Sequence, residues 1–158
     1  MARLLIAGYG FLGEALEARF LSAGWSVDKL SRSGKDSCIA CDLSSTESVS
    51  SLSGNYDLVI HCAASGGGGE ESYRQVYLQG VSNLVDRFPD TRIIFTSSTS
   101  VYGQTDHSDV AEQSPATPST ATGKILREAE DVVLKSQGVV ARLSGLYGPD
   151  RCHVLKNL

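Results

Sequence analysis

Short apolar runs alternate along the chain with longer segments in which apolar residues recur every three or four positions. Each short run predicts a buried strand, and each periodic segment predicts an amphipathic helix. The strands are predicted at residues 3–7, 25–30, 37–41, 56–62, 91–96 and 139–143. The helices are predicted at residues 11–23, 46–52, 70–88 and, from residue 117 or 119, to about 136. Because strands that alternate with helices form parallel sheets, we expect an α/β doubly wound sheet of about six strands in the order 3-2-1-4-5-6.

The first predicted strand ends in a glycine-rich turn. Residues 8–13 read Gly-Tyr-Gly-Phe-Leu-Gly and lead directly into the first predicted helix. In such a turn, the first glycine permits the sharp bend, the second lets a pyrophosphate approach the backbone, and the third lets the helix lie close to the sheet. The helix N-terminus offers unpaired N–H groups and a positive dipole end to the phosphates. The turn therefore predicts a Rossmann-type dinucleotide site, with a plain strand-to-helix turn as the alternative.

The second predicted strand indicates which dinucleotide is bound. An acidic residue about 20 positions beyond the first glycine commonly holds the ribose 2′-hydroxyl. That count leads to Asp28, but the apolar residues Val27 and Leu30 place Asp28 inside the strand and Ser31-Arg32 at its carboxyl end. A hydroxyl and a guanidinium suit a 2′-phosphate, because arginine binds phosphate through a rigid fork of donors. We therefore expect NADP in preference to NAD, with a solvated loop arginine as the alternative for Arg32.

Composition and charge narrow the class of protein without changing the fold. The 158 residues are 41% hydrophobic and 20% charged, which predicts one globular domain over residues 1–158. The net charge of −4, with no basic stripe, argues against a nucleic-acid partner. Apolar runs fall short of the roughly 20 residues that span a bilayer, and the glycine turn interrupts what would be the apolar region of a signal peptide. We expect a cytoplasmic protein without membrane contact.

Three further features carry no clear function. The cysteines lie at positions 38, 41, 62 and 152, and the CxxC spacing of residues 38–41 occurs in redox and zinc sites. Because that pair falls inside a predicted strand and lacks a second pair, we expect four reduced, mostly buried thiols and no metal. His61 is expected as a packed strand residue. The four glycines at 66–69 fit either a mobile loop over a ligand or a plain connector.

Eight segments follow one another in the order and at the spacing of a known family. They read AGYGFLG, CDLS, DLVIHCAAS, GVSNL, FTSSTSVYG, EQSPATP, GK…EAE and ARLSGLYGP. On these segments the chain resembles the extended short-chain dehydrogenase/reductase family, the NAD(P)-dependent sugar epimerases and dehydratases, along nearly its whole length. The resemblance implies that the pyrophosphate lies against Gly8, Gly10, Phe11, Leu12 and Gly13, the adenosine ribose against Ser31 and Arg32, the adenine against Asp42 and Leu43, and the rest of the dinucleotide along Cys62, Ala63 and Ala64. It also implies that Ser98 is the catalytic serine and that Lys124 is the active-site lysine, which holds the nicotinamide ribose.

The sequence departs from the family pattern at position 120. The family has Tyr-x-x-x-Lys, in which both residues share one helix face and the lysine lowers the phenol pKa from about 10 towards the range of a general base. Here Thr120 stands four residues before Lys124, and an aliphatic hydroxyl does not reach that range. Tyr77 also stands where the family usually has asparagine. Tyr102 and Tyr147 are candidate substitutes for the missing phenol, with packing around the strand ends as the alternative.

The resemblance also bears on length and function. The family continues beyond the position of Leu158 into a substrate-binding region, so the chain is either a fragment or a minimal form. Without that region apolar surface would be uncovered, which favours a homodimer through the helices at 70–88 and 119–136 that the family commonly uses. The resemblance implies an oxidoreductase or epimerase-like domain that acts on a nucleotide-sugar or a related carbonyl or alcohol. The alternatives are a non-catalytic dinucleotide-binding sensor or scaffold, and a remnant of the fold that binds nothing.

Overall fold

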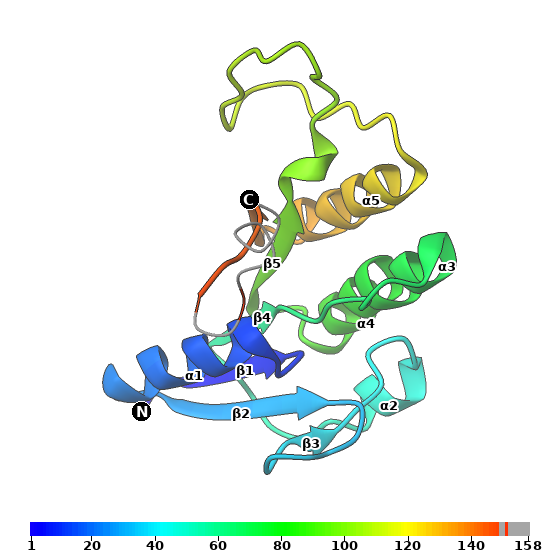
Figure 1. The fold of residues 1–158 in the computed structure, drawn as a ribbon. Coiled ribbons are helices and arrows are strands. Elements are labelled where there is room, and N and C mark those ends of the chain that lie inside the picture. The colour runs from blue at the N-terminus through cyan, green and yellow to red at the C-terminus, as the bar shows by residue number, and fades with distance from the viewer. Residues whose placement is uncertain (149–150, 152–158) are drawn as a thin grey trace.

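A computed structural model of the chain describes residues 1–148 and residue 151, and its strands form one six-stranded sheet (Figure 1). The strands are β1 Arg3–Ala7, β2 Ser26–Ser31, β3 Ile39–Ala40, β4 Leu58–His61, β5 Arg92–Ser98 and β6 Val139–Leu143. They lie in the order β3-β2-β1-β4-β5-β6, and every neighbouring pair is parallel. The predicted α/β fold and the predicted strand order are therefore confirmed.

The helical segments lie near the predicted positions and differ from them in detail, as does the third strand. They are α1 Phe11–Ser22, α2 Thr46–Ser50, α3 Gly69–Tyr73, the π-helical η1 Arg74–Gln79, α4 Gly80–Arg87, the 3-10 helix η2 Thr99–Val101 and α5 Ala121–Lys135. The helix predicted at 70–88 contains a π-helical section, and α5 begins later than predicted. The third strand keeps two of its five predicted residues, because Asp36 and Ser37 have left-handed backbones (φ 56° and 60°) that turn the chain just before it.

Helices cover the two faces of the sheet unequally (Figure 1). On one face, Leu4 and Ile6 of β1 pack towards α1. On the other face, Leu5 and Ala7 belong to a cluster with side chains of α2 and α4, and Phe95 of β5 packs against α5. This alternation follows from the two-residue repeat of a strand. The four residues 4–7 of β1 are fully buried, as in a strand covered on both sides. Within the described residues, every helix is too short or too polar to span a lipid bilayer.

The strand order indicates at which edge of the sheet a ligand would bind. Because all six strands are parallel, their carboxyl ends meet at the same edge. The chain runs from β1 outward to β2 and β3, then returns to the other side of β1 for β4, so the connections on the two sides of β1 diverge. Ligands of such sheets bind in the crevice at this switch point, outside the carboxyl ends of the strands.

Candidate dinucleotide-binding cleft

A cleft of about 770 Å³ lies along the carboxyl edge of the sheet. That volume is in the range of small-molecule and cofactor sites. Many of the residues implicated from the sequence line it: Gly8, Gly10, Phe11, Leu12, Ser31, Arg32, Asp42, Leu43, Cys62, Ala63, Ala64 and Ser98. Two others, Gly13 and Lys124, lie outside the lining. The fold thus brings together residues from five segments of the chain, while the role of each remains a prediction.

The space around the three glycines of the turn differs from one to the next. Gly8 has a φ of +108°, and a Cβ there would lie 2.3 Å from the backbone of Ala63, so only glycine fits. A Cβ on Gly13 would lie 3.0 Å from the Gly8 carbonyl oxygen, which explains how α1 packs so close to the turn. Gly10 differs from both, because its backbone is extended and its absent Cβ would meet no atom of the described residues within 4 Å. Open space therefore borders the backbone of the turn at Gly10.

Tyr9, between the first two glycines, ties the turn to its neighbours. Its phenol donates a hydrogen bond to Glu17 of α1, and Lys29 Nζ of β2 lies 2.9 Å from Glu17 Oε1. The same ammonium lies 4.1 Å from the centre of the Tyr9 ring. Hydrogen bonds from Tyr9 and then Lys29 hold the pKa of Glu17 below its ordinary value. The turn is thereby held in place before any ligand arrives.

The end of β2 carries two polar side chains, Ser31 and Arg32, that line the cleft. The Ser31 hydroxyl is buried, and no hydrogen-bond partner for it exists among the described residues. The neighbouring Arg32 is exposed at the same part of the cleft. Asp28, in contrast, lies within β2 and outside the cleft lining, and its carboxylate accepts from Arg3 Nη2 at 2.9 Å and from the Tyr56 phenol at 3.0 Å. A ligand at this end would meet a hydroxyl and a guanidinium, and the role of both in binding a ribose stays a prediction.

Two thiols, Cys41 and Cys62, line the cleft, and burial disfavours their thiolate forms. Cys62 Sγ donates to the Gly8 carbonyl oxygen at 3.2 Å, and burial raises the pKa of this thiol to about 12. Cys41 is buried, and burial also raises its pKa. Cys38 and Cys62 are half-buried, all three are free thiols, and Cys152 lies outside the described residues. Within the described chain, no cluster of three histidine, cysteine, aspartate or glutamate residues has the arrangement of a metal site.

Ser98 lines the cleft, but Thr120, which stands where the family has its tyrosine, does not. Ser98 ends β5, and its hydroxyl accepts from the Ser100 N–H at 3.1 Å. Thr120 is the N-cap of α5, where its backbone is extended and its hydroxyl accepts from the Gly123 N–H at 3.1 Å. This cap explains why α5 begins at Ala121, later than predicted. Lys124 is exposed in the first turn of α5, and neither it nor Thr120 lines the cleft.

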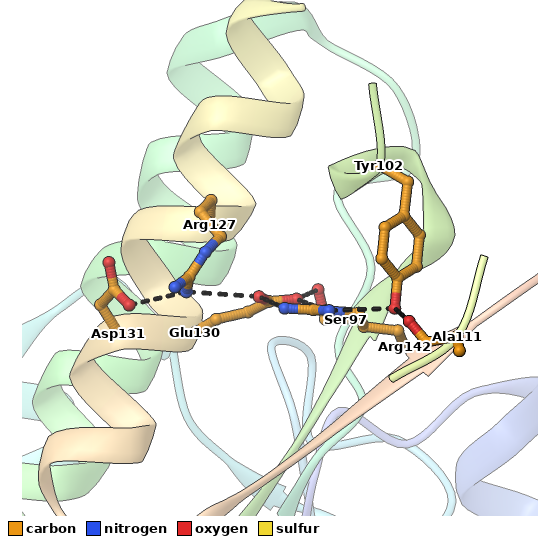
Figure 2. Close-up of polar contacts among 7 residues, drawn as sticks. All are labelled: Ser97, Tyr102, Ala111, Arg127, Glu130, Asp131 and Arg142. Carbon is orange, nitrogen blue, oxygen red and sulfur yellow. Dashed lines mark hydrogen bonds and ion pairs between the residues drawn. The ribbon is translucent and has the colours of Figure 1, made fainter. Parts of the chain in front are cut away.

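The two tyrosines that the sequence suggested as substitutes for the missing phenol lie outside the cleft. Tyr102 lies outside the cleft lining, donates to the Ala111 carbonyl at 3.1 Å and accepts from Arg142 Nη1 at 3.0 Å (Figure 2). Tyr147 also lies outside the lining and is 82% exposed. Tyr73 and Tyr77 do line the cleft. Sequence reasoning missed Tyr73, although its spacing of four residues from Tyr77 on one helix was a usable signal.

A buried ion pair supports the end of β5 from below the cleft. The Glu130 carboxylate of α5 is fully buried and accepts from the Ser97 hydroxyl at 2.7 Å. Arg142, the neighbour of Ser97 on β6, donates to both oxygens of this carboxylate through Nε at 3.0 Å and Nη2 at 2.8 Å. Arg127 of α5 adds a contact at 3.4 Å (Figure 2). Hydrogen bonding to Glu130 raises the pKa of Arg142 further above its ordinary value, so the guanidinium stays charged.

Comparison with known proteins identifies relatives along nearly the whole chain. The model of the NAD dependent epimerase/dehydratase family matches residues 4–157. Protein YeeZ of Escherichia coli strain K12, and that of strain O157:H7, is 35% identical over 96% of this chain and 61% of its own length. This chain therefore spans about three-fifths of the length of these curated relatives.

Solved structures share the fold. One, assigned as an NAD-dependent epimerase/dehydratase from Methylobacillus flagellatus, has a TM-score of 0.82 and 25% identity over 99% of this chain and 59% of its own. UDP-N-acetylglucosamine 4-epimerase from Bacillus cereus has a TM-score of 0.78 and 21% identity over 94% and 55%. A short-chain dehydrogenase/reductase superfamily protein from Agrobacterium tumefaciens, solved with bound NAD, has a TM-score of 0.74 and 22% identity over 90% and 48%. At these identities the last two likenesses concern the fold.

Proposed function

Because the chain belongs to the NAD dependent epimerase/dehydratase family, we propose that it binds a nicotinamide dinucleotide in the cleft along the carboxyl edge of its sheet. The observation that carries the proposal is the glycine turn. Gly8 and Gly13 are closed in by protein atoms, whereas Gly10 borders open space, which is the arrangement expected if only the middle glycine meets a ligand. The test is a titration of the protein with NADPH and NADH, followed by calorimetry and thermal shift.

The residues of the cleft suit the parts of the dinucleotide in order. Gly10, Phe11 and Leu12 would hold the pyrophosphate, where N–H groups of the first turn of α1 lack partners within the helix. Ser31 and Arg32 would hold the adenosine ribose. Asp42 and Leu43 would border the adenine, and Cys62, Ala63 and Ala64 would lie along the remainder. When bound, the nicotinamide supplies a hydride acceptor or donor.

The preference that we propose is for NADP over NAD. The unpartnered Ser31 hydroxyl and the exposed Arg32 suit a 2′-phosphate, while Asp28 is occupied by Arg3 and Tyr56. A hydrogen bond to a charged group contributes about 1.5–3 kcal/mol, so Arg32→Ala should weaken NADPH binding by roughly 10- to 100-fold and leave NADH binding unchanged. Equal affinity for both nucleotides, unaffected by Arg32→Ala, would overturn the preference without affecting the proposal of binding itself.

For the reaction, we propose an oxidoreductase or epimerase-like step on a nucleotide-sugar or a related carbonyl or alcohol. Ser98 would polarise the substrate oxygen, and Lys124 would hold the nicotinamide ribose. A second function, a sensor or scaffold that binds the dinucleotide without turnover, is favoured by one observation. The Thr120 hydroxyl is engaged as a helix cap outside the cleft, so the family's general base is missing from its usual position.

Thr120→Tyr distinguishes the two functions. UDP-N-acetylglucosamine, the substrate named for the Bacillus cereus relative in fold, serves as a first probe, with reduction of NAD or NADP and epimer formation as readouts. Turnover by the natural chain would support the enzyme. Turnover by the Thr120→Tyr variant alone, with unchanged nucleotide binding in both proteins, would support the sensor or scaffold.

Two proposals about context accompany the function. Self-association through α3–α4 and α5 would give a homodimer, which light scattering coupled to gel filtration tests through the molar mass. A cytoplasmic location suits the free thiols Cys38, Cys41 and Cys62, because disulfides form readily in oxidising compartments. A fluorescent fusion of the full protein tests the location.

A further inference from the structure

A π-helical section interrupts one helix where that helix meets the cleft. The segments α3, η1 and α4 follow one another without a gap from Gly69 to Arg87, and η1 covers Arg74–Gln79 in the middle. Residues 75–77 of η1 line the cleft. π-helical turns are rare, and they occur mostly where function requires a helix to deviate. Since a helix of α-helical geometry would have satisfied the same hydrophobic repeat, the deviation at this place calls for a cause.

His61 supplies that cause from the sheet below. Its ring is fully buried at the end of β4, and Nε2 lies 2.9 Å from the carbonyl oxygen of Val76 in η1. A carbonyl only accepts, so Nε2 carries the proton and donates. A Cβ on Gly80 would lie 3.3 Å from the Leu43 Cβ and 3.4 Å from the same Nε2, so the helix backbone lies close to the ring at this point. The ring of Phe95 packs against His61 at 5.3 Å and fixes its plane.

Tyr77, the next residue of η1, passes this arrangement on to the cleft wall. Its phenol oxygen accepts from the Ser65 N–H at 3.3 Å. The Ser72 hydroxyl lies 3.5 Å from the Ser65 carbonyl oxygen, so the backbone of Ser65 is held on both sides. Four glycines with positive φ, residues 66–69, follow directly. They have no side chains with which to fix the loop, so its position depends on the contacts of Ser65.

We propose that His61 and Tyr77 form a positioning unit for the dinucleotide cleft: His61 holds the π-helical turn at Val76, and Tyr77 thereby fixes the loop that follows β4. The inference rests on the proposed function, because its ligand is the dinucleotide. Ala63 and Ala64, which Ser65 adjoins, line the cleft between Gly8 and the end of β5. The adenosine end, at Ser31 and Arg32, belongs to a different strand. The unit therefore acts on the nicotinamide half of the ligand and leaves the adenosine half unaffected.

The test compares NADPH with ADP, which carries the adenosine and pyrophosphate groups and lacks the nicotinamide half. Tyr77→Phe removes one hydrogen bond and keeps the ring, so NADPH should bind roughly two- to tenfold more weakly while ADP binding is unchanged. Tyr56→Phe is the matched control, since it also removes one phenol hydrogen bond, to Asp28, but lies outside the cleft lining and should change neither affinity. His61→Leu should match Tyr77→Phe, and His61→Gln, which keeps an N–H donor, should restore NADPH binding.

The outcomes separate the inference from the function on which it rests. If the natural protein binds NADPH and Tyr77→Phe binds it equally well, the positioning unit is refuted and the function stands. Equal losses of NADPH and ADP, or an equal loss in Tyr56→Phe, would also refute the unit, because they would indicate a general disturbance of the protein. If the natural protein binds neither ADP nor NADPH, the proposed function itself is wrong. Should His61→Leu fail to fold, Tyr77→Phe with its control decides alone.

Discussion

Arg142→Met should destabilise the protein strongly, because it removes the main partner of a carboxylate that has no contact with solvent. Glu130 is 0% exposed, and Arg142 donates to both of its oxygens. The Ser97 hydroxyl at 2.7 Å and Arg127 at 3.4 Å would remain after the substitution. The variant therefore leaves a buried charge with one good hydrogen bond and one distant cation.

The size of the effect follows from the burial of the pair. Removing one partner of a buried ion pair costs about 3–5 kcal/mol. Because Arg142 is 19% exposed and Arg127 compensates in part, we expect the lower end, about 3 kcal/mol. For a chain of this length such a loss corresponds to a fall in the melting temperature of about 6–12 °C.

Urea unfolding, followed by the fluorescence of Trp25, measures the loss. Trp25 packs edge-on against Phe20, 5.2 Å away, so its environment changes on unfolding. The double variant Glu130→Leu/Arg142→Met removes both charges, and it should recover most of the stability. Arg74→Met is the matched control, since its pair with Glu128 is half-exposed on both sides and should be worth less than about 1 kcal/mol. A cost for Arg142→Met no larger than that of Arg74→Met would refute the reasoning.

Three further predictions follow from the site. Gly8→Ala should prevent folding or lower the melting temperature steeply, because its Cβ would overlap the Ala63 backbone at 2.3 Å; thermal unfolding equal to the natural protein would contradict this. Burial lowers the pKa of His61 to about 4, so only the unfolded chain takes up this proton between pH 6.5 and 4. Stability should therefore fall as the pH drops through this window, by up to about 3 kcal/mol, and the fall should be smaller in His61→Leu when urea unfolding is repeated at pH 7, 5.5 and 4.5. The raised pKa of Cys62 predicts slow alkylation by iodoacetamide at pH 8, slower than at Cys38, as peptide mass mapping would reveal.

The sheet could be predicted well from the sequence because each signal for it lies within a short run of neighbouring residues. Each buried strand is a short apolar run, the glycine turn marks the exit from β1, and parallel connections leave few strand orders. The convergence of the cleft residues also follows, since the carboxyl ends of parallel strands share one edge. Ser31 was located correctly at the end of β2 because the apolar residues Val27 and Leu30, which pack on opposite faces of the sheet, mark the extent of that strand.

The features that escaped prediction depend on contacts across the fold. Nothing in the residues of η1 distinguishes a π-helical turn from an α-helical one, because the carbonyl of Val76 is held by His61, fifteen positions earlier. The shortening of β3 comes from two left-handed residues, Asp36 and Ser37, that carry no glycine signal. The cap at Thr120 was readable in principle, because threonine is a preferred N-cap residue. The family pattern instead suggested a position inside the helix.

The most direct test of dinucleotide binding compares the natural protein with Gly10→Val. The absent Cβ of Gly10 would meet no atom of the described residues within 4 Å, so the substitution should change the free energy of unfolding by no more than about 1 kcal/mol, the scale of a helix N-cap. Valine would nevertheless occupy the space in which the pyrophosphate is proposed to lie. We predict saturable binding of NADPH to the natural protein by calorimetry, and its loss in a Gly10→Val variant that remains folded. Two results would contradict the account: NADPH binding of equal strength in both proteins, or no binding of NADPH or NADH to the natural protein.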